Sequence, residues 1–206
     1  MIQVGLSANG GVIWQLVKFF IASYVALALM LGVHALAVVI TGRSPIRHFK
    51  KIMPVLRFAF ISRSSAVTTP LNIEAQIKRL KVHPSIADFS ASFGAMIGQN
   101  GCAGVFPAVL AGMIMPSLAM DAWSVIFVLM LVIVVALVSF AVAGVGGGAT
   151  FAAIIVLSLL DMPLVLVGLV ISIEPLIDMM RTLVNVSGTM TAGVVTQRFL
   201  GRKLQD

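Results

Sequence analysis

The sequence has few charged residues and a single cysteine. Charged side chains make up 10% of the 206 residues, against about a quarter in an ordinary soluble domain. The lone Cys102 excludes a disulfide within the chain. Because 60% of the residues are hydrophobic, and unpaired backbone groups are not tolerated in lipid, the composition predicts an all-α membrane protein.

The basic residues are unevenly placed along the chain. Most of the 14 Lys and Arg side chains fall within 43–57, 78–81 and 198–203, and none occurs between Val82 and Met180. Basic clusters beside apolar spans are typical of cytoplasmic ends. We therefore expect a multi-pass membrane protein, in contact with membrane lipids and with a cytoplasmic C-terminus, and no nucleic-acid partner.

Apolar runs and polar breaks divide the chain into five predicted segments. Three are transmembrane helices, the middle one broken, and two are re-entrant helical hairpins, whose arms are too short to cross a core of about 30 Å. In order, these are a span over 12–41, a hairpin over 44–82, a broken span over 84–117, a hairpin over 121–160 and a span over 163–200.

Each polar break also has a plainer interpretation. The first hairpin, with its SRSSAVTT tip at 62–69, can instead be a pair of amphipathic helices on the cytoplasmic face. GQNG at 98–101 indicates an unwound helix or close helix packing, and AGVGGGA at 143–149 a hairpin tip or a flexible kink. Two hairpins entering from opposite faces are typical of an inverted repeat with a substrate site near the bilayer midplane.

The stretch IEPLIDMMRTLVNVSGTM, 173–190, carries charges inside an apolar segment. At 100° per residue, Glu174, Asp178, Arg181 and Asn185 share a face about 60° wide. A structural ion pair between Asp178 and Arg181 is one explanation. The other is a binding site, because Arg suits carboxylates and Asp suits an ammonium group; it predicts an amino acid with an additional carboxylate as the ligand.

Four motifs resemble the dicarboxylate/amino acid:cation symporters, which have the glutamate-transporter fold. SRSSAVTTP resembles their first-hairpin serine motif, and GAMIGQNGCA stands where their broken helix usually reads G-A-T-x-N-M-D-G-T. AGVGGGA resembles their second-hairpin tip, and DMMRTLVNVSGT their D-x-x-R-T-x-x-N-V-x-G-D motif. NGCAGVFPA and SRSSAVTTPLNIE are most similar to the bacterial L-cystine branch.

The resemblance implies a symporter with elevator-type alternating access. Asp178 would bind the substrate α-ammonium and Arg181 its distal carboxylate, while the second tip would close as an outer gate. The implied substrate contacts are Ser64, Ser65, Cys102, Val145, Gly146, Gly147, Gly148, Asp178, Arg181, Thr182 and Asn185.

Departures from the family pattern concern the coupling cation. Asn100 and Thr189 replace two cation-binding Asp residues, Gly98 replaces an Asn, and Cys102 replaces a Thr. Hard cations prefer charged oxygen ligands, so either a sodium site built from carbonyls or proton coupling through Glu174 is expected. No cofactor is implied beyond Na⁺ or H⁺, and no metal site is assigned with certainty. The coupling candidates are Gly94, Gly98, Asn100, Glu174, Asn185 and Thr189.

The resemblance covers only the C-terminal part of a family member, so residues 1–206 would form one partial transport domain of a protein in the bacterial plasma (inner) membrane. It implies that scaffold helices ahead of this region complete the transporter, and that the full-length protein is a homotrimer. Besides L-cystine uptake, a dicarboxylate or glutamate symporter and a fragment without transport activity remain open. An enzyme is not expected, because Arg181 shares the face of Asp178 and intramembrane aspartyl chemistry needs two carboxylates without such a neutralising partner.

Overall fold

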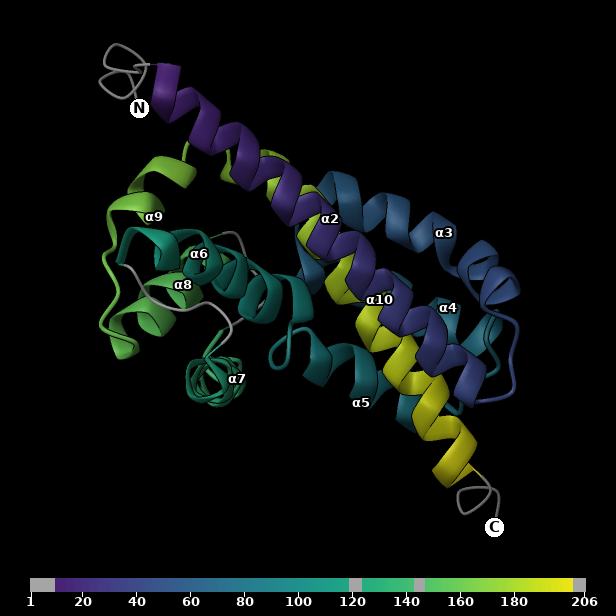
Figure 1. The fold of residues 1–206 in the computed structure, drawn as a ribbon. Helices are drawn as coiled ribbons and strands as arrows, with labels where there is room; N and C mark the ends of the chain where they lie inside the picture. Colours follow the sequence, from purple (N-terminus) through teal and green to yellow (C-terminus); the bar gives the residue numbers. More distant parts are fainter. Residues whose placement is uncertain (1–9, 119–123, 143–146, 202–206) are drawn as a thin grey trace.

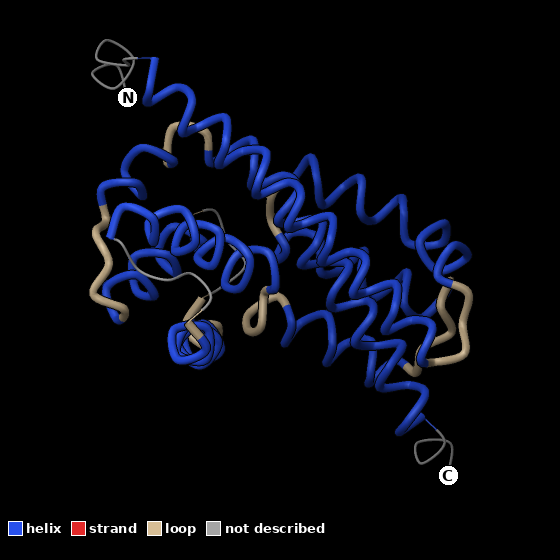
Figure 2. Tube along the Cα trace, viewed as in Figure 1, coloured by secondary structure: helices blue, strands red, loops and turns tan. Residues whose placement is uncertain are grey.

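The chain folds as a bundle of helices. The structure, a computed structural model, describes residues 10–118, 124–142 and 147–201, and within these ranges it contains no strand (Figures 1 and 2). The elements are α2 (Gly10–Ile40), α3 (Pro45–Ser62), α4 (Ser65–Lys78), α5 (Pro84–Gly94), η1 (Asn100–Val105), α6 (Phe106–Ile114), η2 (Met115–Leu118), α7 (Val125–Val138), α8 (Gly148–Leu159), α9 (Val165–Val170) and α10 (Glu174–Leu200).

Helix α2 agrees with the predicted span over 12–41. It is the only helix within the described ranges that is both long and apolar enough to cross a membrane, with a mean hydropathy of 2.2 over its best window. One face, which includes Phe19, Leu27 and His34, is buried, and the helix lies beside α10 (Figure 1). Apart from Gln15 and Lys18 near its start, the exposed remainder is mainly apolar, as expected of a surface that faces lipid.

Helices α3 and α4 form the pair predicted over 44–82. Arg63 ends α3 with a left-handed backbone (φ 52°) and donates its N–H to the Ala59 carbonyl. Ser64 then caps α4, its Oγ accepting a hydrogen bond of 3.3 Å from Val67 N. The sharp reversal therefore rests on one strained residue and one capping hydroxyl.

The predicted broken span over 84–117 is interrupted in its middle. Helix α5 ends at Gly94, and Gly98 takes a left-handed backbone (φ 74°) while its N–H bonds the Ser139 carbonyl at 3.2 Å. The chain then resumes as η1, a π-helix. Single π-turns occur frequently at functional sites because they widen the helix and free backbone groups.

Helices α7 and α8 occupy the positions of the two hairpin arms predicted over 121–160. Figure 1 views α7 nearly along its axis and α8 from the side, so the two helices cross steeply. Gly147, with φ 86°, precedes the first turn of α8. Four residues of the predicted tip, 143–146, lie outside the described residues, as does Asp121.

The single helix predicted over 163–200 is wrong at its start. The structure divides it into α9 and α10, separated by turns at 171–173 whose hydrogen bonds run three residues back, as from Glu174 N to the Ile171 carbonyl at 3.4 Å. Pro175 follows at the first turn of α10. Because proline lacks an N–H and restricts the residue before it, a continuous helix through this point is disfavoured.

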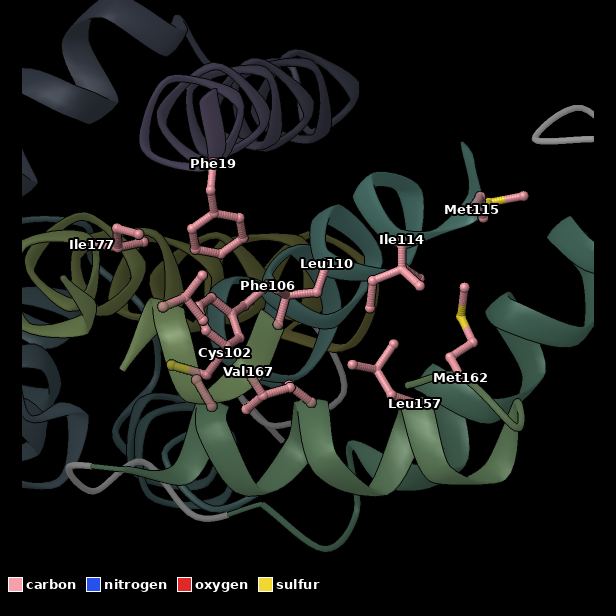
Figure 3. Close-up of a cluster of buried hydrophobic side chains, with 14 of the residues drawn as sticks. Phe19, Cys102, Phe106, Leu110, Ile114, Met115, Leu157, Met162, Val167 and Ile177 are labelled. Atoms are coloured by element: carbon pink, nitrogen blue, oxygen red, sulfur yellow. The ribbon is translucent and has the colours of Figure 1, made fainter. Parts of the chain in front are cut away.

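Helix α10 joins two hydrophobic clusters. In the first, Phe19 of α2 meets Phe106 of α6 edge-to-face with ring centroids 5.5 Å apart, and Ile177 of α10 lies in the same cluster (Figure 3). The second packs Met190 and Val194 of α10 against α3, α4 and α5. Both helix pairs are therefore fixed relative to α10, and its polar residues lie between them.

Candidate substrate site

A pocket opens where the tips of both helix pairs meet the start of α10. Its volume is about 290 Å³. Ser62, Arg63 and Ser64 line it from the first tip, Gly147 from the second, and Glu174, Pro175 and Asp178 from α10. The structure thus brings together three of the motifs that the sequence singled out, although they are separated by as many as 116 positions along the chain.

The two carboxylates that line this pocket on α10 belong to an ionic cluster. Arg181 Nη2 donates to Asp178 Oδ1 at 3.0 Å and to Glu174 Oε1 at 3.1 Å. The Arg181 side chain is 1% exposed, while both carboxylates are 15% exposed. Removing one partner from such a buried group leaves an uncompensated charge, so the three side chains act as one unit.

The guanidinium of Arg181 retains unused hydrogen-bonding capacity. Its Nε and Nη1 are buried without a hydrogen-bond partner, and its central carbon lies 4.3 Å from the ring centroid of Phe106. Stacking on an aromatic face holds the plane of a guanidinium. Each free N–H donor lies next to Nη2 on one edge of the guanidinium, and such an edge suits a carboxylate when Nη2 is released. Sequence reasoning missed Phe106, whose position directly after NGCAGV was the available signal.

Asn185 faces the π-helix rather than the pocket. Its Oδ1 accepts a 2.7 Å hydrogen bond from Gly101 N, and its Nδ2 donates to Gln99 Oε1 at 2.9 Å and to Cys102 Sγ at 3.0 Å. Asn185, Thr182 and Cys102 are all buried. Among the predicted substrate contacts, these three lie beneath the pocket lining, and Asn185 ties η1 to α10.

The remaining predicted contacts divide between the two tips. Ser64 lines the pocket, whereas the neighbouring Ser65 is buried behind it. Gly147 lines the pocket, and Gly148 is buried at the start of α8. Val145 and Gly146 lie outside the described residues.

Close approach of η1 and α10 leaves no room for a side chain at Gly101. A Cβ there would lie 2.8 Å from the Arg181 carbonyl oxygen and 3.0 Å from Arg181 Cα, both of them backbone atoms. Such atoms shift only if α10 itself moves. At Gly104, in the same π-helix, a Cβ meets nothing within 4 Å.

We therefore expect Gly101→Ala to destabilise the chain by about 1–3 kcal/mol through overpacking, with Gly104→Ala as the matched control that leaves stability nearly unchanged. Thermal unfolding of both variants in detergent measures the difference. Equal melting temperatures for the two variants would show that η1 and α10 are not in tight contact.

The coupling candidates are divided between the broken segment and α10 and do not converge on one point. Asn100 Nδ2 is 3.3 Å from His34 Nε2, and Thr189 Oγ1 accepts a 2.7 Å hydrogen bond from Asn72 Nδ2. Gly94 sits against the side chain of Thr189, and Gly98 against α7. Within the described residues, no group of three or more His, Cys, Asp or Glu side chains is arranged to hold a metal ion.

Three polar residues of this region, His34, Asn72 and Gln76, had no role in the sequence-based prediction. His34 bridges α2 to α10 through a 3.1 Å contact between its Nδ1 and Ser187 Oγ. Asn72 accepts a 2.9 Å hydrogen bond from Gln76 and donates to Thr189. Burial of a histidine in an otherwise apolar span was the signal for the first; nothing local marks the other two.

Comparison with known proteins identifies the family to which the chain belongs. The model of the sodium:dicarboxylate symporter family matches residues 1–199. The chain is 56% identical over 194 residues to the L-cystine uptake protein TcyP of Bacillus anthracis, covering 94% of this chain and 42% of that protein. TcyP of Shouchella clausii is 55% identical over 183 residues, covering 89% and 39%, and an uncharacterized symporter of Haemophilus influenzae is 52% identical over 202 residues, covering 98% and 46%.

The chain thus spans less than half the length of these relatives. The match nevertheless runs through almost all of its own residues, including both tips and all but the last residue of α10. The family is described as one of symporters coupled to a cation, sodium. The chain belongs to the sodium:dicarboxylate symporter family, which consists of membrane transporters and not of enzymes.

Proposed function

We propose that the chain is the substrate-binding C-terminal part of a secondary active symporter that takes up L-cystine across the bacterial plasma membrane. The observation that carries the proposal is the pocket in which both tips meet Glu174 and Asp178 of α10. The identity of more than half of all residues with TcyP proteins favours L-cystine over other amino acids.

In this proposal, the substrate replaces contacts within the ionic cluster. Its α-ammonium takes Asp178, and its distal carboxylate takes Arg181 through Nη2, in place of the two carboxylates, together with one of the unpaired groups Nε and Nη1. Ser64 and Ser65 offer hydroxyl and backbone groups to the α-carboxylate. Asn185 and Thr182 support the site from below by holding η1 and the helix core, and the second tip, Val145 to Gly148, closes over the substrate.

Glu174 gives the site a feature that suits cystine in particular. Each half of cystine carries both a carboxylate and an ammonium group, so the distal end presents a positive charge that aspartate and glutamate lack. Glu174 Oε1 and Arg181 Nη2 are paired at 3.1 Å, which places a negative and a positive group side by side for such an end. A dicarboxylate would meet Glu174 with its like charge, which is unfavourable.

The membrane arrangement belongs to the same proposal. Helix α2, the broken segment α5–α6 and α10 cross the bilayer, and the two helix pairs enter it from opposite faces without crossing. The C-terminus is cytoplasmic. Scaffold helices supplied by the rest of the transporter hold the domain in a homotrimer, against which it moves as an elevator.

Coupling by protons through Glu174 is the version of cation coupling that this chain supports best. Asn100 and Thr189 carry no charge, and Thr189 Oγ1 already accepts a hydrogen bond from Asn72 and donates one to the Val186 carbonyl. Glu174 is the carboxylate at the pocket wall whose partner, Arg181, the substrate would engage. Substrate binding releases that carboxylate from Arg181, and once protonated it still accepts a hydrogen bond from the distal ammonium group through its carbonyl oxygen.

A chimera tests the function directly. This chain replaces the matching C-terminal region of the Bacillus anthracis relative, and uptake of radiolabelled L-cystine is measured in whole cells. We expect uptake that unlabelled L-cystine inhibits and aspartate does not. Inhibition by aspartate but not by L-cystine would contradict the assigned substrate. As a control, the chain alone in liposomes should show no L-cystine flux, because the proposed scaffold helices are not present in that experiment.

Glu174→Gln in this chimera is expected to make uptake insensitive to the proton gradient. The amide keeps the hydrogen bond to Arg181 but cannot exchange a proton. Uptake is measured with sodium removed and then with the pH gradient collapsed, with Glu74→Gln, an exposed glutamate on α4, as the control. If Glu174→Gln leaves the pH dependence intact and sodium removal stops uptake, coupling through Glu174 is wrong and a sodium site replaces it.

A further inference from the structure

A second pocket lies at the far end of the bundle, where α2 turns into α3. Its volume is about 400 Å³. The turn after α2, the first two turns of α3 and the residues that follow α4 line it, through Arg43, Ser44, Arg47, His48, Lys51 and Lys81. It shares no residue with the substrate pocket.

The charge of this pocket is of one sign. Four of its lining residues are Lys or Arg, and no Asp or Glu is among the described residues that line it. Arg43 Nη1 donates a 2.7 Å hydrogen bond to the Leu80 carbonyl, which ties the turn after α2 to the end of α4. Arg79 Nη1 likewise reaches the Lys51 carbonyl at 3.2 Å. The basic walls are therefore held in place rather than free to separate.

His48 supplies an independent sign of a missing ligand. The residue lines the pocket and is only 3% exposed, yet neither ring nitrogen has a hydrogen-bond partner. Its neighbour Phe49 contacts the ring edge-on at 5.6 Å between centroids, which offers no acceptor for an imidazole N–H. A buried polar group without a partner is costly, and an anion in this pocket would accept the hydrogen bond.

The start of α3 adds a further donor surface. Ser44 is its N-cap, and the Ser44 side chain makes no capping hydrogen bond. The positive end of this 18-residue helix thus lacks the acceptor that a capping side chain usually gives, and it is open to an anionic oxygen.

We propose that this pocket binds a phosphate group, and specifically the headgroup phosphate of an anionic phospholipid on the cytoplasmic leaflet. Arg43, Arg47, Lys51 and Lys81 surround the charge, and His48 donates to one of its oxygens. Basic pockets between membrane helices on the cytoplasmic side are suited to such headgroups. Basic residues that only set the orientation of the chain in the membrane would need neither a pocket nor a buried histidine without a hydrogen-bond partner.

The neighbouring surface favours a lipid over a free ion as the source of the phosphate. A groove of about 760 Å³ begins at Pro45, next to Ser44 of the pocket, and is lined mainly by apolar residues of α3 such as Ile46, Phe49 and Met53. An acyl chain lies favourably along such a surface, whereas inorganic phosphate gains nothing from it. Headgroup and chain would therefore occupy adjoining sites around the start of α3.

Lipid retention by the full 206-residue chain tests the proposal. The chain is placed in phosphatidylcholine nanodiscs that contain a minor fraction of phosphatidylglycerol, and native mass spectrometry counts the lipids that remain bound. The pocket variant is Arg47→Gln/Lys51→Gln. The matched control, Lys78→Gln/Arg198→Gln, removes the same charge from exposed positions at the cytoplasmic ends of α4 and α10, outside the pocket.

Wild type and the control should retain phosphatidylglycerol in preference to phosphatidylcholine. We expect the pocket variant to lose roughly 25-fold in this preference, about fivefold for each cation near the headgroup. His48→Phe, which keeps the ring volume but removes both nitrogens, should weaken retention about fivefold with all positive charges in place. Unchanged thermal unfolding of each variant confirms that the fold is intact.

Two further results decide whether the phosphate group comes from lipid or from solution, and whether the pocket binds it at all. If inorganic phosphate, titrated onto the chain in pure phosphatidylcholine discs, binds to wild type and not to the pocket variant, the phosphate assignment stands and the ligand comes from solution. If the pocket and control variants lose phosphatidylglycerol equally, or if neither the pocket variant nor His48→Phe loses any, the basic residues act only as diffuse charge and the proposal is wrong. Transport is not measured, so this outcome leaves the proposed function untouched.

Discussion

Replacing Arg181 with alanine should abolish the uptake of every substrate that carries a distal carboxylate. Arg181 is 1% exposed, holds Asp178 and Glu174 through Nη2, and keeps Nε and Nη1 unpaired. Removing one member of a buried, hydrogen-bonded charge pair typically costs several kcal/mol in binding. We therefore expect L-cystine affinity in the chimera to fall on the order of a hundredfold to a thousandfold, measured by competition against labelled substrate.

Loss of folding must be separated from loss of binding in that experiment. Arg181→Ala leaves two carboxylates at the pocket wall without their cation, which itself destabilises the site. Arg181→Lys keeps the charge but presents a point donor in place of a planar fork. It should fold normally, as judged by membrane expression and thermal unfolding, and still bind L-cystine at least about tenfold more weakly. If the lysine variant bound L-cystine as tightly as the wild type, bidentate recognition of the carboxylate by Arg181 would be wrong.

The polar face of α10 is the part of the site that could be predicted from the sequence. Helical periodicity alone places residues 174, 178 and 181 on one side, and the structure joins them by two hydrogen bonds of 3.0 and 3.1 Å. The interruption near residue 98 was predictable as well, because glycines flank an amide within an apolar run. Both features depend on local spacing, which a single sequence contains.

Contacts between distant segments could not be predicted in the same way. Asn185 lies on the predicted face, yet its partners are Gln99, Gly101 and Cys102, more than 80 positions away. Nothing in the sequence near Asn185 indicates that η1 would be π-helical and present its N–H groups there. The shape of the broken helix decides whether this amide meets substrate or backbone, and that shape arises from packing.

The start of α10 shows a different limit. Apolar composition continues from 163 into 173, so hydropathy predicts one helix, but the turns at 171–173 break it. The break has a consequence for the site, because it puts Glu174 in the first turn of α10. A carboxylate there is stabilised by the helix dipole, and the same residue is free to line the pocket.

Replacing Asp178 with asparagine should have the complementary effect, loss of all amino-acid substrates whatever their side chain. The α-ammonium is common to every amino acid, whereas the distal carboxylate is not. Asparagine keeps the size of the side chain and one acceptor for Arg181 Nη2, which Asp178 Oδ1 now engages at 3.0 Å, but it cannot neutralise an ammonium group. We expect uptake of L-cystine, and binding of any amino-acid competitor, to fall about thirtyfold or more.

The distinguishing measurement compares Asp178→Asn with Arg181→Lys against two sets of competitors, amino acids with and without a distal carboxylate. Asp178→Asn should weaken both sets equally, whereas Arg181→Lys should weaken only the first. Asp161→Asn, an exposed aspartate between α8 and α9, controls for loss of a negative charge. If Asp178→Asn discriminates between the two sets, the ammonium lies elsewhere in the pocket, and Glu174, which shares its wall, is the carboxylate that holds it.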